Sequence, residues 1–125
     1  MEKLLRYFGK DLQDIDLEDW LKQKPEALRP IAAKWFAIIK NCGKDVQDIF
    51  HDNYPIGCVE NAPFAYVNVF KEHVNVGFFY GTDLIDKTHL LEGTGKRMRH
   101  VKLRPNQTHD DKAISSLIQA AYFDI

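Results

Sequence analysis

The chain of 125 residues is short enough for one domain, spanning 1–125, and long enough to bury a hydrophobic core. Its 17 basic side chains nearly balance 18 acidic ones, which leaves a net charge of −1. This balance argues against nucleic acid or an anionic membrane as a partner, because proteins built for those partners carry a basic excess. No apolar run is long enough to cross a bilayer, so we expect a soluble protein.

The N-terminal residues 1–24 predict a short helical turn, a loop stopped by Gly9 and a second short helix capped near Asp16. The acids of this segment are spaced a little like a calcium-binding loop. However, Asp19 stands where that loop needs glycine, and Pro25 stands where it needs glutamate. We therefore interpret these acids as a solvated edge of an N-terminal helical extension.

The best helical pattern runs from Pro25 to Gly43, where apolar residues recur at helical spacing along one stripe. Pro30 suits the start of this helix, and Gly43 suits its C-terminal end. A shorter helix over residues 44–52 is expected to follow, and residues 56–60 are expected to form the first strand.

Residues 63–81 predict two strands joined by a tight turn at Lys71-Glu72, which places Asn68 opposite Asn75. Because alternate residues of a strand point in opposite directions, the hairpin has two faces. One face is apolar and is expected to form core: Ala65, Val67, Val69, Val74, Val76 and Phe78. The other face combines aromatic rings, amides and a histidine: Phe64, Tyr66, Asn68, Phe70, His73, Asn75 and Phe79.

A helix of one to two turns is expected from Asp86 to Glu92, with two buried leucines. A glycine turn and a basic strand over residues 97–104 are expected next. The Gly95-Lys96 pair invites comparison with a phosphate-binding loop. That motif is excluded because Arg97 replaces the magnesium-binding hydroxyl and because the segment leads into a strand.

The last element is predicted to be a helix that begins near Thr108, because residues 108–111 have the spacing of a capping box. Its apolar face contains Ile114, Leu117, Ile118, Ala121 and Tyr122. Helices, several strands and a closing helix together predict an α+β fold. We expect an antiparallel sheet of about four strands with the helices packed on one face.

If Val101 and Leu103 face the helices, His100 lies on the same side of the sheet as the polar residues of the hairpin. This side could hold a small anionic ligand or a metal ion, with imidazoles as nitrogen ligands. The alternative is that it packs under a dimer partner or a terminal segment. The candidate ligand-binding residues are Tyr66, Asn68, His73, Asn75 and His100.

Three basic residues after the two glycines are candidates for a local anion nest: Lys96, Arg97 and Arg99. The alternative is a solvated basic edge strand, whose charges discourage aggregation. The histidine and aspartate pairs near 51–52 and 109–111 are interpreted as residues at element ends. The residues alone do not identify a metal.

Catalysis has little support in the sequence. Cys42 and Cys58 lie in apolar settings without paired spacing, and no leader precedes them, so we expect reduced thiols and a cytoplasmic location. Neither has the surroundings of a catalytic nucleophile.

Several segments together resemble the YdhG-like family of small bacterial domains of unknown function, over roughly residues 25–123. The most specific parts are Lys71-Glu72-His73 between two strands and the Gly95-Lys96 turn before the last strand. The resemblance implies an α+β fold similar to frataxin. For some members it implies a role as an intracellular iron chaperone, and hence iron as the metal.

Three functional hypotheses follow. The first is a non-enzymatic domain that binds a small ligand or metal ion on the open sheet face, with iron delivery as its family-derived form. The second is an interaction module whose aromatic face forms a homodimer. The third, which lacks a supporting triad or metal spacing, is an enzyme on a small anionic substrate with His73 or His100 as general base.

Overall fold

The computed structural model describes residues 5–125, which form one five-stranded antiparallel sheet and three α-helices. One short 3-10 turn, at Gly9–Asp11, precedes these elements, and two more, at Glu26–Leu28 and Gly81–Asp83, lie between them. The helices are α1 (Leu17–Lys22), α2 (Arg29–Lys40) and α3 (Asp111–Phe123). The strands are β1 (Val46–His51), β2 (Tyr54–Val59), β3 (Ala62–Val69), β4 (Val74–Phe78) and β5 (Arg99–Leu103).

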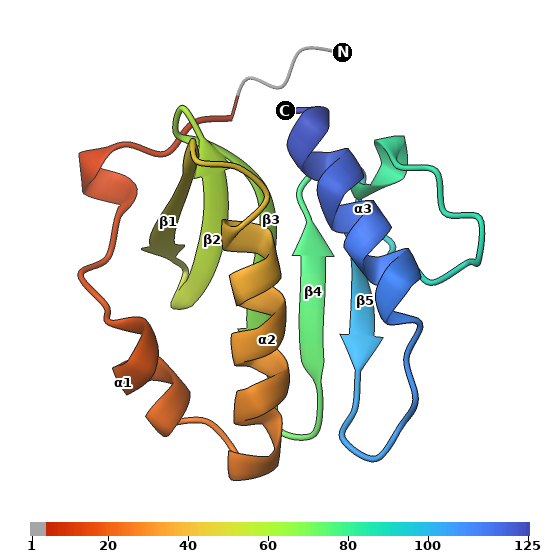
Figure 1. The fold of residues 1–125 in the computed structure, drawn as a ribbon. Helices are drawn as coiled ribbons and strands as arrows, with labels where there is room; N and C mark the ends of the chain where they lie inside the picture. Colours follow the sequence, from red (N-terminus) through yellow and green to blue (C-terminus); the bar gives the residue numbers. More distant parts are fainter. Residues whose placement is uncertain (1–4) are drawn as a thin grey trace.

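Each strand pairs with the next strand along the chain, in the order β1-β2-β3-β4-β5. Helices α2 and α3 lie on the same face of this sheet, as Figure 1 shows. The α+β class and the packing of helices on one face are therefore confirmed. The opposite face, which we call the open face, carries none of the three α-helices of residues 5–125.

The core lies between the sheet and the two long helices. Helix α2 fits closely against β2, because a Cβ atom at Gly57 would lie only 2.5 Å from Cγ2 of Ile39. Helix α1 joins this core through Trp20, whose indole nitrogen donates to the carbonyl of Asn53 at 2.7 Å. The buried residues of the two long helices are Ala32, Trp35, Phe36, Ile39, Ile114, Leu117, Ile118 and Ala121.

The β3–β4 hairpin has the predicted register. Asn68 pairs with Asn75, and the amide of Phe70 donates to the carbonyl of His73 at 2.9 Å, which closes the turn around Lys71 and Glu72. The apolar face predicted for this hairpin is buried against the helices. Strand period and turn length were enough to set this register, because the two strands are adjacent in the chain.

The predicted helix over residues 44–52 is wrong, since this segment contains β1 and raises the strand count from about four to five. Asp52 and Asn53 connect β1 to β2 with φ values of 54° and 68°. Two successive residues in the left-handed region form the tight hairpin turn whose twist matches the strands, and they end any helix. The Asp-Asn pair was the sequence signal for this turn.

The predicted helix from Asp86 to Glu92 is also absent from the described residues. His89 has a φ of 56°, and the Asp86 carboxylate accepts the amides of Leu90 and Leu91 at 2.9 and 2.8 Å. A helix would instead direct those amides to backbone carbonyls. The two leucines are half-buried against the core as part of a loop.

The prediction for Phe64 is corrected as well. A bulge between Gly57 and Cys58 leaves Phe64 without a partner in the register, so Phe64 and Ala65 both face the helices. The Phe64 ring contacts Tyr122 of α3 with ring centroids 5.7 Å apart. An inserted residue breaks the alternation of a strand, and periodicity alone cannot locate it.

The helix starts were predicted to within a few residues. Asp16 caps α1 by accepting the amide of Asp19 at 3.2 Å, and Pro30 lies in the first turn of α2. Helix α3 begins later than expected. Its cap is Asp110, which accepts the amide of Ala113 at 3.0 Å, and not Thr108. The aspartate nearest the helix supplied the acceptor.

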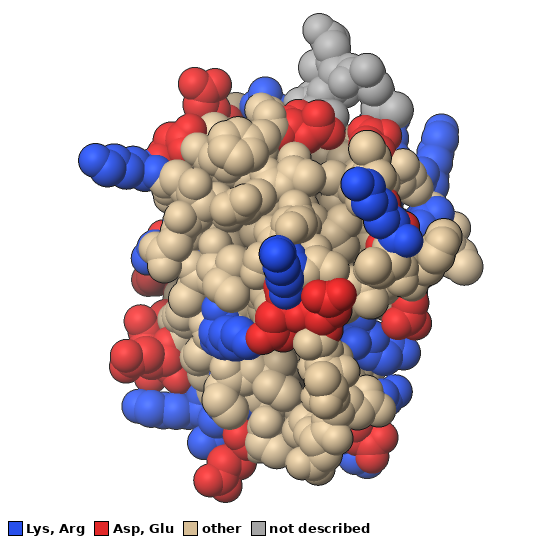
Figure 2. All heavy atoms as spheres, turned by 45° about the vertical axis from the view of Figure 1, so that its right-hand side comes forward, with Lys and Arg blue, Asp and Glu red and all other residues tan. Residues whose placement is uncertain are grey.

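Two findings bear on the outer surface. Within residues 5–125, none of the helices has the length and apolar character required to span a membrane. On the face that carries α3 and the loop after β4, basic and acidic side chains are interspersed (Figure 2). That pattern agrees with the near-zero net charge.

Candidate functional site

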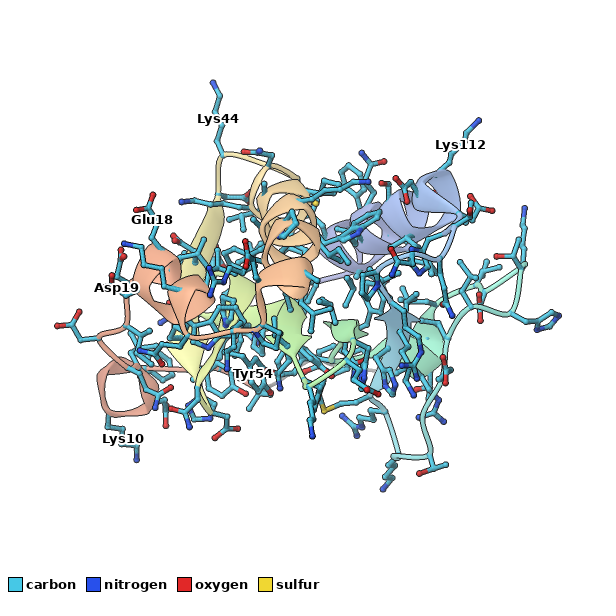
Figure 3. All side chains as sticks on the ribbon, turned by 90° about the horizontal axis from the view of Figure 1, so that it is seen from below. Lys10, Glu18, Asp19, Lys44, Tyr54 and Lys112 are labelled. Atoms are coloured by element: carbon cyan, nitrogen blue, oxygen red, sulfur yellow. The ribbon has the colours of Figure 1, made fainter. Side chains whose placement is uncertain are left out.

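The open face divides into an aromatic half and a polar half. The aromatic half includes Tyr54, which Figure 3 shows on the side of the sheet away from Lys112 of α3. Here the Tyr66 ring lies 4.9 Å from that of Tyr54 and 5.6 Å from that of Phe79. Tyr66 also lies over Gly77, because a Cβ atom at that glycine would overlap the ring.

The N-terminal segment covers part of this aromatic half. Tyr7 contacts the ring of His51 at 4.4 Å between centroids, and its amide donates to Asn61 at 2.9 Å. Burial is the main reason why the pKa of Tyr66 is raised to about 12. Tyr66, one of the predicted ligand-binding residues, is therefore packed among other rings, and its ligand-binding role stays a prediction.

The polar half lies over β4 and β5, and we call it the polar patch. The β4–β5 register pairs His100 with Gly77 and Lys102 with Asn75, so these side chains project from the open face. The predicted placement of His100 beside the hairpin residues is thereby confirmed. The patch consists of His73, Asn75, Glu92, His100, Lys102 and Arg104.

Sequence reasoning missed Glu92, because residues 86–92 were interpreted as a helix. Glu92 reaches the outer edge of β5 through an isolated bridge: its amide donates to His100 at 2.8 Å, and the amide of His100 donates back at 2.9 Å. No local pattern signalled a pairing that involves a single residue of a loop.

The two histidines favour their neutral form. Burial lowers the pKa of His73 from its ordinary value, and the positive charges of Lys102 and Arg104 lower it further, while Glu92 acts in the opposite direction. Burial also lowers the pKa of His100, where Glu92 opposes and Lys102 reinforces the shift. These mutual effects indicate that the charged groups of the patch lie close to one another.

The patch contains one buried polar atom that makes no hydrogen bond, the side-chain oxygen of Asn75. Asn75 is only 8% exposed, and its side-chain oxygen Oδ1 has no hydrogen-bond partner. The oxygen of Asn68, directly opposite in the register, accepts the amide of Val69 at 2.9 Å. A buried acceptor without a partner is rare in folded proteins and marks a position that another group can complete.

The predicted anion nest does not join the polar patch through Arg99. In the register Arg99 pairs with Phe78, on the helix side of the sheet, and its guanidinium donates to the carbonyls of Gly95 and Met98. Lys96 and Arg97 are exposed on the loop before β5. Their ligand-binding role stays a prediction.

The cysteines are both free thiols, as predicted. Burial raises the pKa of Cys58 to about 12 and also raises the pKa of Cys42. Both thiols are therefore protonated at neutral pH, which suits core residues better than nucleophiles.

A groove between α3 and residues 83–88 was not anticipated from the sequence. It has a volume of about 540 Å³ and is lined largely by apolar and small residues, with Leu117 of α3 and Ile85 of the loop among them. One of its polar groups, the Asp86 carboxylate, is used to hold the loop. The polar patch, with the unpartnered side-chain oxygen of Asn75 and its clustered charges, is the stronger candidate site.

The model of a family described as a domain of unknown function, DUF5655, matches residues 10–124. The chain belongs to this family. The DUF5655 match includes α1, so it begins earlier than the predicted resemblance over residues 25–123, and it says nothing of a YdhG-like or frataxin-like relationship. No curated protein and no solved structure matches the chain.

Proposed function

We propose that this domain binds a small anionic ligand on the open face of the sheet, at the polar patch. The observation that carries the proposal is the positive charge of Lys102 and Arg104 beside the buried side-chain oxygen of Asn75, which has no hydrogen-bond partner. Lys102 and Arg104 bring two positive charges against the single carboxylate of Glu92, so the patch favours an anion. Neutral imidazoles at His73 and His100 add hydrogen-bond donors without further charge.

A metal ion is the less supported form of the hypothesis. Among residues 5–125, no group of three or more histidine, cysteine, aspartate or glutamate side chains is arranged to hold a metal ion. The iron-chaperone role implied by the YdhG-like resemblance, and the frataxin-like relationship itself, remain predictions. Anaerobic titration with ferrous iron tests that role, which requires saturable NMR line broadening around His73 and His100.

A homodimer surface is the second candidate function. It is favoured by Phe70, which is 43% exposed and stacks on His73 with ring centroids 4.7 Å apart. An exposed aromatic residue beside the patch would bury apolar surface in a dimer. Sedimentation at low micromolar concentration tests this candidate, and a strict monomer would count against it.

The anion proposal is tested by amide-resolved NMR titration with sulfate at constant ionic strength. We expect saturable shifts at His73, Asn75, His100 and Lys102. Substitution Lys102→Met keeps most of the side-chain stem and removes the charge, so it should weaken binding roughly ten-fold, as expected for loss of a charge-assisted hydrogen bond.

The matched control is Lys112→Met, which removes the same charge from the exposed surface of α3, away from the open face (Figure 3). This variant should bind sulfate like the unmodified protein. If both variants bound sulfate equally weakly, the loss of affinity would come from the net charge of the protein and not from the polar patch. Shifts confined to residues 93–99 would move the anion site to the glycine turn.

A further inference from the structure

The side-chain oxygen of Asn75 limits which anions suit the polar patch. This oxygen is buried and accepts no hydrogen bond, although Lys102, His73 and His100 all lie in the patch around it. The patch therefore combines positive charge with an acceptor that lacks a donor. A ligand that satisfies both must carry negative charge and a hydrogen-bond donor of its own.

We infer that the polar patch selects anions that carry an O–H or N–H group next to their charge, with that group donating to Oδ1 of Asn75. This inference rests on the proposed anion-binding function and adds the ligand class to it. Hydrogenphosphate belongs to this class. Sulfate, which has the same tetrahedral shape but no proton at neutral pH, does not.

The ligand reaches Oδ1 only after a neighbouring side chain moves, because that oxygen is shielded from solvent. Lys102 lies opposite Asn75 in the register and is only half-buried, and its side chain has four rotatable bonds. We expect its ammonium group to turn towards a bound anion, which opens the side of Asn75 that Lys102 flanks in the register.

The experiment compares inorganic phosphate with sodium sulfate near pH 7, by NMR titration of the unmodified protein. Phosphate carries no more negative charge than sulfate at this pH, so charge alone cannot favour phosphate. We expect phosphate to bind about ten-fold more tightly, the effect of one hydrogen bond to a charged group.

Two substitutions locate the effect at Asn75. Asn75→Val removes the acceptor, and it should abolish the preference for phosphate while sulfate affinity changes less than about two-fold. Asn75→Asp keeps an acceptor and adds a negative charge, so it should weaken both anions and preserve the preference for phosphate. Because the second variant keeps an acceptor of the same shape at this position, loss of the preference in it would overturn the inference, so it remains informative if the first variant fails to fold.

The outcomes separate the two proposals. Equal affinities for phosphate and sulfate in the unmodified protein would overturn the donor requirement and leave anion binding intact. Retention of the preference in Asn75→Val would also overturn it, because the discrimination would then come from another group. Failure of both anions to bind would remove the proposed function and this inference together.

Discussion

Asn68 and Asn75 face each other across β3 and β4, and they differ in how their side-chain oxygens are used. The Asn68 oxygen accepts the amide of Val69, whereas the Asn75 oxygen is buried without a partner. Desolvation of an unpaired acceptor costs free energy that folding does not recover. The fold therefore carries a local destabilisation at the same residue that we assign to ligand recognition.

This destabilisation can be measured by substitution. Asn75→Val should raise the free energy of unfolding by about 1 kcal/mol, because it removes the unpaired acceptor and valine suits a strand. The control is Asn68→Val, which removes a satisfied acceptor and should lower the free energy of unfolding by about 0.5–1 kcal/mol. Urea denaturation measures both values. If both variants lose stability equally, the Asn75 amide is satisfied in the folded protein.

At the scale of elements, the two hairpins at the β1 side share one turn design. Asn53 and Asn61 both have left-handed backbone conformations, and a glutamine side chain bonds each of them. The Gln47 side chain donates to Oδ1 of Asn61 at 3.1 Å and accepts the backbone amide of Asn61 at 2.7 Å. The Gln13 side chain makes the same two hydrogen bonds with Oδ1 and the backbone amide of Asn53. These paired bonds hold the turns that set the register of β1, β2 and β3.

The Asn61 turn gives a prediction at this scale. Asn61→Ala should lower the free energy of unfolding by about 2 kcal/mol, because alanine is strained at a φ of 66° and loses the bond from Gln47. Asn61→Gly relieves the backbone strain and should cost only about half as much. Urea denaturation of the two variants compares them. Equal losses would show that the side-chain bond, and not the backbone, accounts for the effect.

The elements that could be predicted were those whose sequence pattern is contained within the element itself. The β3–β4 hairpin and α2 were predicted because period and stops are contained within each segment. The helix predicted over 44–52 failed although Val46, Ile49 and Phe50 have helical spacing. The Asp52-Asn53 turn pairs this segment with β2, which places Ile49 on the opposite face from Val46 and Phe50. The helix over 86–92 failed because the Asp86 side chain bonds the amides that a helix would have used.

For the whole molecule, the two patch histidines make stability depend on pH. Their pKa values are lowered in the folded protein below the ordinary value of about 6.5, so the unfolded chain binds more protons as the pH falls. Their contribution to stability is therefore complete above pH of about 6.5 and is lost as the pH falls towards their folded pKa values. The charged groups that act on them are Lys102, Arg104 and Glu92, and His100 also lowers the pKa of His73.

Denaturation at about pH 7.5 and about pH 5.5, roughly the limits of the range in which histidine titrates, measures this dependence. The double substitution His73→Gln and His100→Gln should reduce the loss of stability at the lower pH. His89→Asn, on the exposed loop, is the matched control and should leave it unchanged. Sulfate should stabilise the unmodified protein more at the lower pH, since protonated imidazoles attract the anion. A pH-independent sulfate effect would place the anion away from these histidines.

The sequence by itself determined the α+β class, the β3–β4 register and the apolar stripes of α2 and α3. All of these follow from periodicity and from turns between neighbouring segments. Only the tertiary structure decided that Val101 and Leu103 face the helices, which places Arg99 on that side and His100 on the open face. It also decided that Tyr66 packs among rings and that Glu92 joins His100 at the edge of β5. Such contacts join residues that are distant in the chain or depend on a single bridge. They are selected by the free energy of packing, and no local sequence pattern indicates them.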